Sequence, residues 1–332
     1  NSRFPSEKAQ SDQVMQMCES FALLGHEVIL VVPDRQGVVA EDPFVHYGRE
    51  RTFTLKRLPC LDWTRFSWMG PMGFWVQTFS FVVALRACVT TLQPMVVYSR
   101  DLYALIWSWS RVRRVWESHS LHRSLIARFI VRKLDLVVTL TKESAKRLHD
   151  LGVKESRILV EPDAVDPRLF EQMPTREEAR KALNILPDEW LCLYVGKFTT
   201  MGAPKGLEES IAAVRALRKE GRRVRLLAVG GTKQELFKYA SLQEEGIQLL
   251  GHQPQASLKR FYAAGDAVLM PFPYTPHYAF FMSPLKLFEY LMSGLPIVTS
   301  NLPSVREIVT EKEAFFVEPG SITSLQTTLA QM

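Results

Sequence analysis

The sequence predicts an α/β fold with two Rossmann-like, doubly wound domains that face a central cleft. The length of 332 residues suits two domains, and 47% hydrophobic with 23% charged residues is typical of a folded protein. Short apolar runs, typical of buried parallel strands, alternate with helical segments in both halves of the chain. Ligands of such sheets bind beyond the carboxyl ends of the strands, so the motifs at those ends are the candidate site.

The first half begins with a helix and continues with a series of strands. One helical face carries the apolar side chains of Val14, Met17, Cys18, Phe21 and Ala22. Gly25 marks the end of this helix, because glycine tolerates the left-handed conformation of a helix cap. The apolar runs expected to be strands are 28–33, 95–100, 114–119, 135–141 and 157–162, with helices between them at 120–133 and 142–151.

A crossing between the domains is expected at residues 163–189. This stretch has three prolines and a charged helix but no strand. We therefore place the first domain at 1–165 and the second at 166–332. The strands expected in the second domain are 190–196, 224–231, 247–251, 266–272, 295–300 and 314–319, and its clearest helices are 206–221 and 283–294.

The two ends of the chain bear on the completeness of the first domain. The chain opens at Asn1 with a polar, loop-like segment that leads directly into a helix, and it stops at Met332 within a helical pattern. A doubly wound domain begins with a strand. We therefore expect the first strand and the C-terminal end to be truncated.

Charge and cysteine content narrow the class of protein. The net charge of +6 favours anionic partners such as nucleotide phosphates, nucleic acid or an anionic membrane. The basic residues form no recognised nucleic-acid-binding module, so no nucleic acid is expected. The four cysteines lack CxxC and zinc-site spacing and are expected to be reduced thiols of a cytoplasmic protein. The apolar run 69–92 is broken by Gln77 and Arg86, and we expect it to fall short of a membrane span.

The strongest motif is FFMSPLKLFEYLMSGLPIVTS, residues 280–300. Ser283 is a favoured N-cap, Pro284 suits the first helical position, and the free N–H groups that follow could bind an anion. Lys286 opposes the helix dipole, which argues against a purely stabilising role. Glu289 lies where a carboxylate could bond both hydroxyls of a ribose. The alternative is a capped amphipathic helix with no ligand.

A second motif is YVGKFTTMGAPKG, residues 194–206, at the end of an expected strand. Lys197 follows Gly196, and Lys205 precedes the next helix, so the two lysines could flank a diphosphate. The alternative is a solvated loop. A third motif is WESHSLH, in which His119 ends a strand of the first half, and Arg100 ends the neighbouring strand. A hydrogen-bonded loop histidine is the alternative there.

Taken together, these segments resemble the family 4 retaining glycosyltransferases of the GT-B fold, also described as glycosyl transferases group 1. The likeness covers nearly the whole chain. Besides the donor motif, it rests on FPSEKAQSDQVMQMCESFALLGHEVILVVP, VEPDAVDPRLF and GHQPQASLKRFYAAGDAVLMPF. Each segment alone is unspecific, whereas their combination in this order is specific.

The resemblance implies roles for individual residues. It places Lys197 and Lys205 on the donor diphosphate, Glu289 on the ribose and His119 near the transferred sugar. The remaining donor-binding positions that it implies are Gly196, Gly230, Gly231, His252, Ser283, Pro284, Leu285 and Lys286. Lys8 and Arg100 are expected on the acceptor side.

The chain departs from the family pattern at two positions. Phe281 replaces the first glutamate of the E-x7-E pattern, and Ala164 replaces the glycine of the interdomain segment. The first change affects how the sugar hydroxyls are held, and the second affects the hinge. The chain has no D-x-D motif, so neither a metal nor another cofactor is expected.

The expected function is therefore metal-independent, retaining transfer of a sugar from a nucleotide-diphosphate-sugar to a glycan or lipid-linked acceptor, in polysaccharide biosynthesis. A nucleotide-sugar epimerase or hydrolase of the same fold is one alternative, and a non-catalytic nucleotide-sugar-binding protein is another. The expected location is the cytoplasm, peripheral to the inner face of the plasma membrane.

A membrane-facing surface is expected in the first half. Basic residues interleave with apolar ones at Arg111, Arg113, Arg114, Arg123, Arg128, Arg132 and Lys133. Aromatic residues precede this stretch at Trp63, Phe66, Trp68, Phe74 and Trp75. Such a surface would meet an anionic membrane and a lipid-linked acceptor. The alternative is a solvated helix face beside a core helix.

Overall fold

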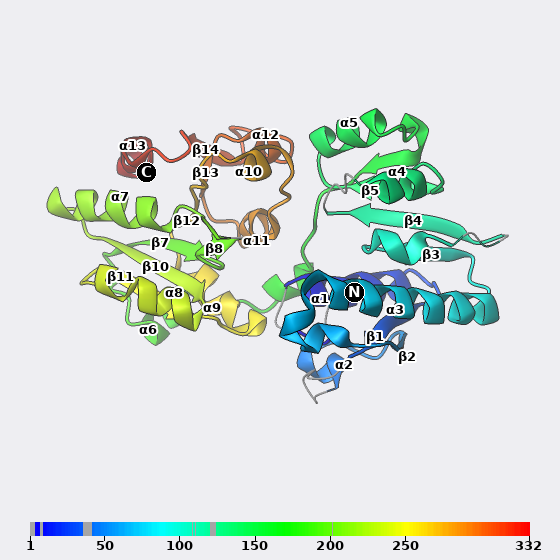
Figure 1. Ribbon diagram of the computed structural model, residues 1–332. Coiled ribbons are helices and arrows are strands. Elements are labelled where there is room, and N and C mark those ends of the chain that lie inside the picture. Colours follow the sequence, from blue (N-terminus) through cyan, green and yellow to red (C-terminus); the bar gives the residue numbers. More distant parts are fainter. Residues whose placement is uncertain are drawn as a thin grey trace. The chain divides into compact units, whose positions relative to one another are not determined.

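The computed structural model describes residues 4–6, 9–35, 42–107, 109, 111–119, 124–200 and 202–332. The chain forms two compact units, one from residues 1–138 and 148–159 and the other from 139–147 and 160–332 (Figure 1). Residues 139–147, which we expected in the first domain, pack with the second unit. There the Thr141 hydroxyl donates to the carbonyl of Phe280 at 2.7 Å. The boundary expected at 165–166 stays a prediction.

The second unit is built on a six-stranded sheet of order β11-β10-β7-β12-β13-β14. Its strands are β7 (Trp190–Val195), β10 (Val224–Gly231), β11 (Ile247–Gly251), β12 (Ala267–Met270), β13 (Ile297–Ser300) and β14 (Ala314–Val317). Every neighbouring pair is parallel, so all carboxyl ends lie at one edge of the sheet. All six were expected from the sequence, with several expected ends one or two residues too long.

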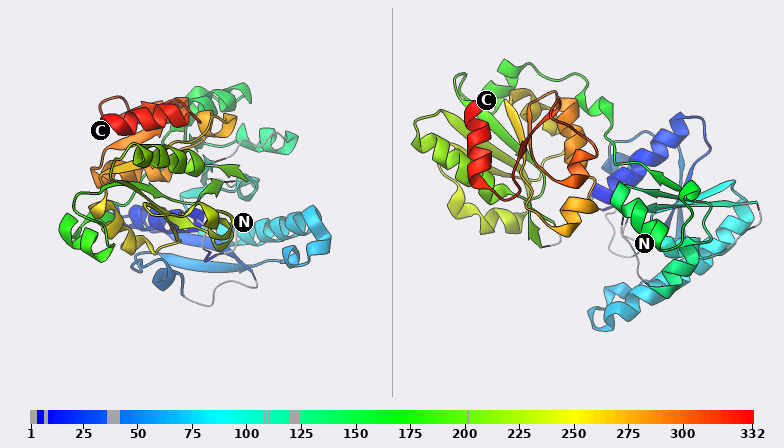
Figure 2. Two further views of the ribbon diagram at one scale, coloured as in Figure 1. Left: turned by 90° about the vertical axis from the view of Figure 1, so that its left-hand side faces the viewer. Right: turned by 90° about the horizontal axis from the view of Figure 1, so that it is seen from above.

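Helices cover both faces of this sheet, which is why its strands are continuous apolar runs. The helices are α6 (Arg176–Ala182), α7 (Leu207–Lys219), α8 (Lys233–Lys238), α9 (Leu258–Ala264), α10 (Pro276–Phe280), α11 (Leu285–Ser293), α12 (Pro303–Arg306) and α13 (Ile322–Gln331). Side chains of α7 and α13 share one core with Cys192 and Tyr194 of β7. Side chains of α6, α9 and α11 share the other core with Leu191 and Leu193. Figures 1 and 2 show α7 and α13 side by side on one face.

The first unit is also α/β, but its described strands form two separate sheets. The strands are β1 (Ile29–Asp34) paired in parallel with β2 (Thr54–Pro59), and a second sheet β3 (Val96–Ser99), β4 (Arg113–Ser118), β5 (Leu136–Thr139) and β6 (Ile158–Val160) in that order. Its helices are α1 (Ala9–Leu23), α2 (Pro43–His46), α3 (Gly70–Leu92), α4 (Leu125–Val131) and α5 (Lys142–Asp150), the last of which spans both units. The short 3-10 helices used below are η1 (Trp63–Arg65), η2 (Ser67–Met69) and η3 (Leu102–Leu105).

The buried face of α1 differs from the expected one. The buried residues are Ser11, Met15 and Glu19, one row of the helix, whereas the apolar residues expected in the core are only half-buried. An ion pair allows Glu19 to be buried, because Arg49 donates to its carboxylate at 3.1 Å.

The apolar run at 69–92 forms the 23-residue helix α3. Contrary to expectation, this helix is long and apolar enough to cross a membrane by length and composition, and it alone is so in the described part of the chain. However, 44% of its most apolar window is buried within the structure. A core helix of a soluble protein meets the same criteria, so α3 is weak evidence for a span.

Two expectations for the basic stretch also change. The helix expected at 120–133 is the shorter α4, and residues 120–123 lie outside the described part of the chain. Arg114 is buried rather than on the surface. Its guanidinium donates to the carbonyl groups of Leu105, Trp107 and Lys133.

Candidate nucleotide-sugar site

Two glycines lie near the centre of the carboxyl edge of the six-stranded sheet in the second unit. Gly196 follows β7, and its N–H donates to the carbonyl of Val229 at 2.7 Å. Gly230 has a φ of +120°, and a Cβ there would lie 2.7 Å from the carbonyl oxygen of Gly196. No side chain fits between these two chain segments. The close approach of the two segments therefore requires glycine at position 230, and the expected contact of both glycines with a ligand stays a prediction.

The segment that carries Lys197 and Lys205 is a small hairpin rather than an open loop. Its strands are β8 (Thr199–Thr200) and β9 (Ala203–Pro204), which pair antiparallel. The buried hydroxyl of Tyr194 lies 3.3 Å from the carbonyl oxygens of both Lys197 and Lys205. The hairpin thus brings two lysines that are eight positions apart to the same edge of the sheet.

Lys205 lies in an unusual environment for a cation. Its Nζ is 5.0 Å from the centre of the Phe272 ring, which follows β12. Burial, together with the positive charges of Lys286 and Lys197, lowers the pKa of Lys205 from 10.5 to about 8, against a weaker opposing effect of Glu235. Lys205 thus lies near two other lysines, and neither Lys205 nor Lys197 is ion-paired within the described part of the chain.

Helix α11 begins one residue later than expected. Its N-cap is Pro284, without a side-chain capping bond, and Leu285 and Lys286 are the first helical residues. Ser283 is not the cap, because its Oγ instead accepts the N–H of Asp163 at 2.8 Å. The N–H of Leu287 donates to the carbonyl of Pro284 at 2.9 Å, whereas those of Leu285 and Lys286 precede the first bonds of the helix and remain suited to an anion.

Lys286 and Glu289 form an ion pair on the first turns of α11. The Nζ of Lys286 lies 2.8 Å from Oε1 and 2.7 Å from Oε2 of Glu289. The buried Tyr262 of α9 also donates its hydroxyl to Oε2 at 2.7 Å. The position of this pair is fixed by Tyr290, whose hydroxyl accepts the N–H of Val195 in β7 at 3.0 Å. A Cβ on Gly196 would lie 3.7 Å from Cγ of Lys286, so the two motifs of the second half meet.

The other two positions expected near the nucleotide lie at the ends of β10 and β11. The N–H of His252 donates to the carbonyl of Gly231 at 3.1 Å. A Cβ on Gly231 would lie 2.5 Å from the ring of Phe198. Both residues are thus at the same carboxyl edge as the lysines. Gly231 ends β10, which neighbours β7, and His252 follows β11, which neighbours β10.

Phe281 occupies the position of the missing first glutamate. Its ring lies beneath the guanidinium of Arg147, with Cζ 4.1 Å from the ring centre. Arg147 belongs to the 139–147 segment that packs on the second unit. At this position the chain therefore has a packing contact in place of a carboxylate.

The first unit has its own cluster at the ends of β3 and β4. Glu117, which the sequence analysis overlooked, accepts from Nη2 of Arg100 at 2.7 Å and from Nε2 of His119 at 2.6 Å through Oε1. Its Oε2 accepts the hydroxyl of Tyr98 at 2.8 Å. Arg100 also donates to the Gln13 side chain of α1 at 2.8 Å. The carboxylate thus joins two residues that the sequence analysis placed separately.

The charges of this cluster balance one another. Burial disfavours the charged carboxylate, but the hydrogen bond from His119 and the charge of Arg100 outweigh it and lower the pKa of Glu117 from 4.5 to about 2. Arg100 is almost fully buried, with 8% of its side chain exposed, whereas His119 is 32% exposed. His119 is therefore open to a ligand, and Arg100 is placed to fix Glu117. Lys8 lies outside the described residues.

Two residues important to these clusters carried only weak sequence signals. Glu117 is an acidic residue within a buried strand, which requires a partner and could have prompted a search for one. The sequence pattern predicts Tyr262 only as a core aromatic residue of an amphipathic helix, and its position in that pattern gives no indication of a bond to Glu289.

Comparisons with known proteins agree with this architecture. Residues 10–169 match the family described as Glycosyltransferase Family 4, and residues 189–332 match that described as Glycosyl transferases group 1. Sucrose-phosphate synthase from Thermosynechococcus elongatus has a similar fold, with a TM-score of 0.71 and 18% identity, over 98% of this chain and 84% of that one. Anabaena HepE in complex with UDP and glucose gives a TM-score of 0.67 and 15% identity, over 99% and 88%.

The fold and the two matching domains define a GT-B glycosyltransferase. The chain belongs to glycosyltransferase family 4, with a group 1 domain as its second half. In sequence it is 26% identical to the 2-deoxystreptamine glucosyltransferase of Streptomyces kanamyceticus over 215 residues. This aligned region covers 62% of this chain and 53% of that protein. The chain thus spans about half the length of this relative.

Proposed function

We propose that the second unit binds a nucleotide-diphosphate-sugar and that the chain transfers the sugar to an acceptor hydroxyl. The observation that carries this proposal is the meeting of Lys197, Lys205 and Lys286 at the carboxyl edge, beside the first turn of α11. A diphosphate offsets the mutual repulsion of these cations and accepts hydrogen bonds from the free N–H groups of the helix. The presence of UDP in the HepE complex supports this ligand class.

The proposed reaction places these charges where negative charge develops. The bond between the anomeric carbon and the diphosphate oxygen breaks, and the nucleoside diphosphate leaves with the electron pair. The acceptor oxygen bonds to the anomeric carbon on the same face, and the acceptor proton passes to the departing phosphate. Lysines and helix N–H groups held in place before reaction stabilise the leaving group as its charge grows. They supply the charge stabilisation that a bound metal would otherwise give, so the proposal is metal-independent.

The neighbouring residues are assigned to the rest of the donor. We propose that Glu289 accepts the ribose hydroxyls, that His252 contacts the base, and that Gly196, Gly230 and Gly231 allow the backbone to approach the nucleotide. In the first unit, His119 is proposed to contact the transferred sugar. Glu117 holds the His119 ring through Nε2, so Nδ1 is the nitrogen left for that contact.

The first test is turnover with separated products. UDP-, GDP- and ADP-linked sugars are incubated with and without acceptor extracts, and the released nucleoside diphosphate is quantified. We expect acceptor-dependent release with one nucleotide class, and NMR of the product is expected to show the anomeric configuration of the donor. Release that ignores the acceptor would indicate a hydrolase or epimerase, and binding without any turnover would indicate a binding protein.

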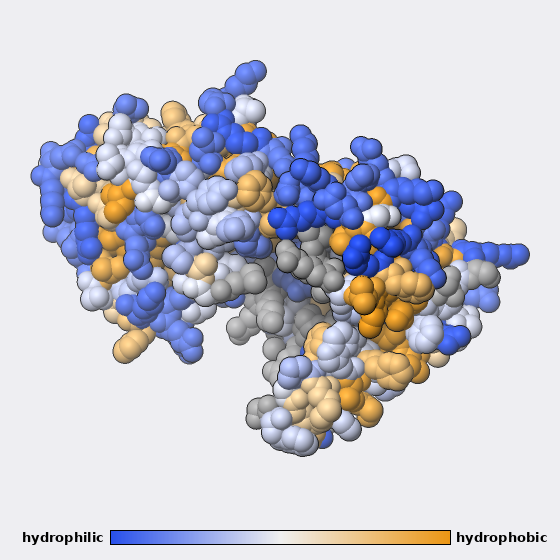
Figure 3. Space-filling model, turned by 45° about the horizontal axis from the view of Figure 1, so that its top comes forward, coloured by the Kyte–Doolittle hydropathy of each residue, from blue (hydrophilic) through white to orange (hydrophobic). Residues whose placement is uncertain are grey.

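We also propose that the first unit carries an apolar surface for a lipid-linked acceptor at an anionic membrane. The segment from 61 to 79 exposes large apolar side chains, and Trp68 is 78% exposed. This segment is held in place, because the Ser80 hydroxyl accepts the N–H of Leu61 at 2.9 Å and Arg35 pairs with Asp62 at 3.2 Å. Figure 3 shows hydrophobic surface beside hydrophilic surface on the right-hand side of the molecule, which belongs to the first unit.

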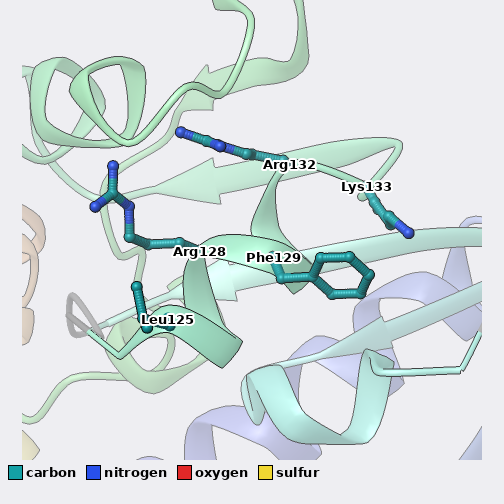
Figure 4. A pocket seen from close by; sticks show the side chains of 5 residues that line it. All are labelled: Leu125, Arg128, Phe129, Arg132 and Lys133. Carbon is teal, nitrogen blue, oxygen red and sulfur yellow. The ribbon is translucent and has the colours of Figure 1, made fainter.

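Helix α4 adds positive charge to this proposed surface. Leu125 is 81% exposed, and a shallow pocket of about 410 Å³ lies among Leu125, Arg128, Phe129, Arg132 and Lys133 (Figure 4). The Nζ of Lys133 lies 3.8 Å from the centre of the Phe129 ring. Exposed apolar and basic side chains on one helix favour an anionic bilayer over a neutral one.

Vesicle co-sedimentation tests the membrane proposal. We expect binding to vesicles that contain phosphatidylglycerol and weak binding to pure phosphatidylcholine, with salt reducing the former. Trp68→Ala and Phe129→Ala should each weaken binding. Phe237→Ala is the matched control, because Phe237 is 87% exposed but lies in the second unit. Equal losses in all three variants, or no binding at low salt, would end the proposal.

A further inference from the structure

Tyr262 is buried in α9 of the second unit, beside the carboxylate of Glu289. It is 2% exposed, and its ring packs against Phe170 at 5.5 Å and Tyr290 at 6.2 Å between centres. Its hydroxyl donates to Oε2 of Glu289 at 2.7 Å. Burial and the negative charge of Glu289 raise the pKa of Tyr262 well above 10.0, so the phenol remains a hydrogen-bond donor at any physiological pH.

Glu289 therefore receives hydrogen bonds from two donors of different mobility. Lys286 is partly exposed, with 25% of its side chain accessible, and its flexible chain can turn to another anion. Tyr262 is fixed by its core packing, and its hydroxyl donates to Glu289. When a diphosphate draws Lys286 away, Tyr262 is the partner in the described structure that still holds the carboxylate.

We propose that Tyr262 is a positioning residue of the donor site, which holds the carboxylate of Glu289 in place for the ribose hydroxyls while Lys286 turns to the diphosphate. This inference rests on the proposed donor site and deepens it. A carboxylate has room for about four hydrogen bonds, so the bond from Tyr262 leaves lone pairs free for both ribose hydroxyls. Without that bond Glu289 would follow Lys286, and recognition of the ribose would be lost before binding of the phosphates.

The test compares ribose recognition rather than affinity alone. Dissociation constants of UDP, GDP and ADP are measured by calorimetry, and those of their 2′,3′-dideoxy analogues are measured beside them. The preference for the ribonucleotide over its dideoxy analogue is the readout. We expect Tyr262→Phe to reduce this preference about fivefold or more, because a hydrogen bond to a charged group is lost, with little change in affinity for the dideoxy analogue.

Tyr239→Phe is the matched control. Tyr239 is another buried tyrosine of the second unit, and its hydroxyl bonds Nζ of Lys238 instead of Glu289. A merely structural role of the Tyr262 hydroxyl predicts the same loss of preference in both variants, or a lower melting temperature with the preference intact. Either result would overturn the inference. In the background of Glu289→Gln, Tyr262→Phe should have no further effect on the preference.

A measurement on the unmodified protein covers the case in which Tyr262→Phe does not fold. The Tyr262 side chain is labelled with ¹³C at Cζ, and its NMR resonance is followed during titration. We expect a shift with the ribonucleotide and none with the dideoxy analogue, and equal shifts with both would contradict the inference. If the unmodified protein binds the nucleotide but shows no ribose preference, the inference alone fails. If it binds no nucleotide, the proposed donor site fails with it.

Discussion

At the scale of single residues, Lys205 joins the features on which the proposed anion site of the second unit rests. It is positively charged at neutral pH and packed on the Phe272 ring, and burial together with the charges of two nearby lysines lowers its pKa to about 8. A cation in such a position is unfavourable until an anion arrives. The same arrangement that weakens the free protein therefore favours a bound diphosphate.

The pKa of Lys205 predicts a pH dependence of nucleotide binding. A diphosphate favours the protonated lysine, which is the main form below pH 8 in the free protein and is lost above it. We expect nucleotide affinity to fall roughly tenfold between about pH 7.5 and pH 9.5, where the nucleotide phosphates are fully ionised. Calorimetry over this range measures the effect.

The control for this prediction is Lys219, at the far end of the helix that follows Lys205. Lys219→Ala removes an equal charge from the last turn of α7, where Lys219 is exposed. This variant should keep the pH dependence, whereas Lys205→Met should bind weakly at every pH without it. An unchanged profile in Lys205→Met would assign the titration to another group.

As pH rises, the lowered pKa of Lys205 affects the free energy of unfolding in the opposite direction from nucleotide affinity. Because the folded pKa of Lys205 lies below the unfolded value of 10.5, the unfolded chain binds more protons between about pH 8 and 10.5. The contribution of this residue to the free energy of unfolding therefore rises with pH through that window. Nucleotide binding weakens over the same range.

At the scale of elements, the start of α7 fixes where Lys205 lies. Gly206 is the N-cap of α7 with a φ of +84°, and a Cβ there would lie 2.0 Å from the carbonyl oxygen of Pro271. The lysine hairpin and the end of β12 are therefore in contact through a position that accepts only glycine. Displacing this contact would move Lys205 away from Phe272.

Gly206 and Gly221 have the same backbone conformation, so comparing substitutions at the two positions distinguishes the cost of a steric clash from the cost of backbone strain. Gly221 also has a φ of +84°, but a Cβ there would meet nothing within 4 Å. Gly221→Ala should cost about 1–2 kcal/mol of unfolding free energy from the left-handed conformation alone. Gly206→Ala should cost more, and it should also weaken nucleotide binding. Equal costs in urea denaturation would show that the close approach to Pro271 is absent in solution.

Elements of the second unit were predictable because their strands are buried on both faces. The run at 190–196 is uninterrupted and that at 224–231 is broken only by Arg225, a pattern typical of a covered parallel sheet. β2 was missed for the opposite reason. Its Lys56 and Arg57 are exposed at the edge of a two-stranded sheet, so the strand carries no apolar pattern.

The candidate site was predictable to the extent that it depends on chain order. Lys197, Lys205 and Lys286 follow strands or open a helix at one edge, and parallel topology alone brings such positions together. Side-chain pairing was not predictable in this way. The bonds from Tyr262 to Glu289 and from His119 to Glu117 depend on packing between elements, and the capping role expected of Ser283 was wrong because Asp163 occupies its hydroxyl.

At the scale of the whole molecule, the two units carry different kinds of surface. The second unit has a cationic edge, which we propose binds a nucleotide diphosphate, and the first has a balanced cluster around Glu117 and an exposed aromatic segment. We propose that lysines and helix N–H groups of the second unit bind the donor without a metal.

The most direct test of this claim is thermal stabilisation by UDP, GDP and ADP, each with and without EDTA. A ligand at 100 times its dissociation constant adds about 2.7 kcal/mol of stability, which raises the melting temperature of a domain of this size by roughly 5–10 °C. We predict a shift by one nucleotide class that EDTA does not change and that Lys205→Ala abolishes while Lys219→Ala retains it. No shift with any nucleotide, or a shift that EDTA removes, would contradict the account.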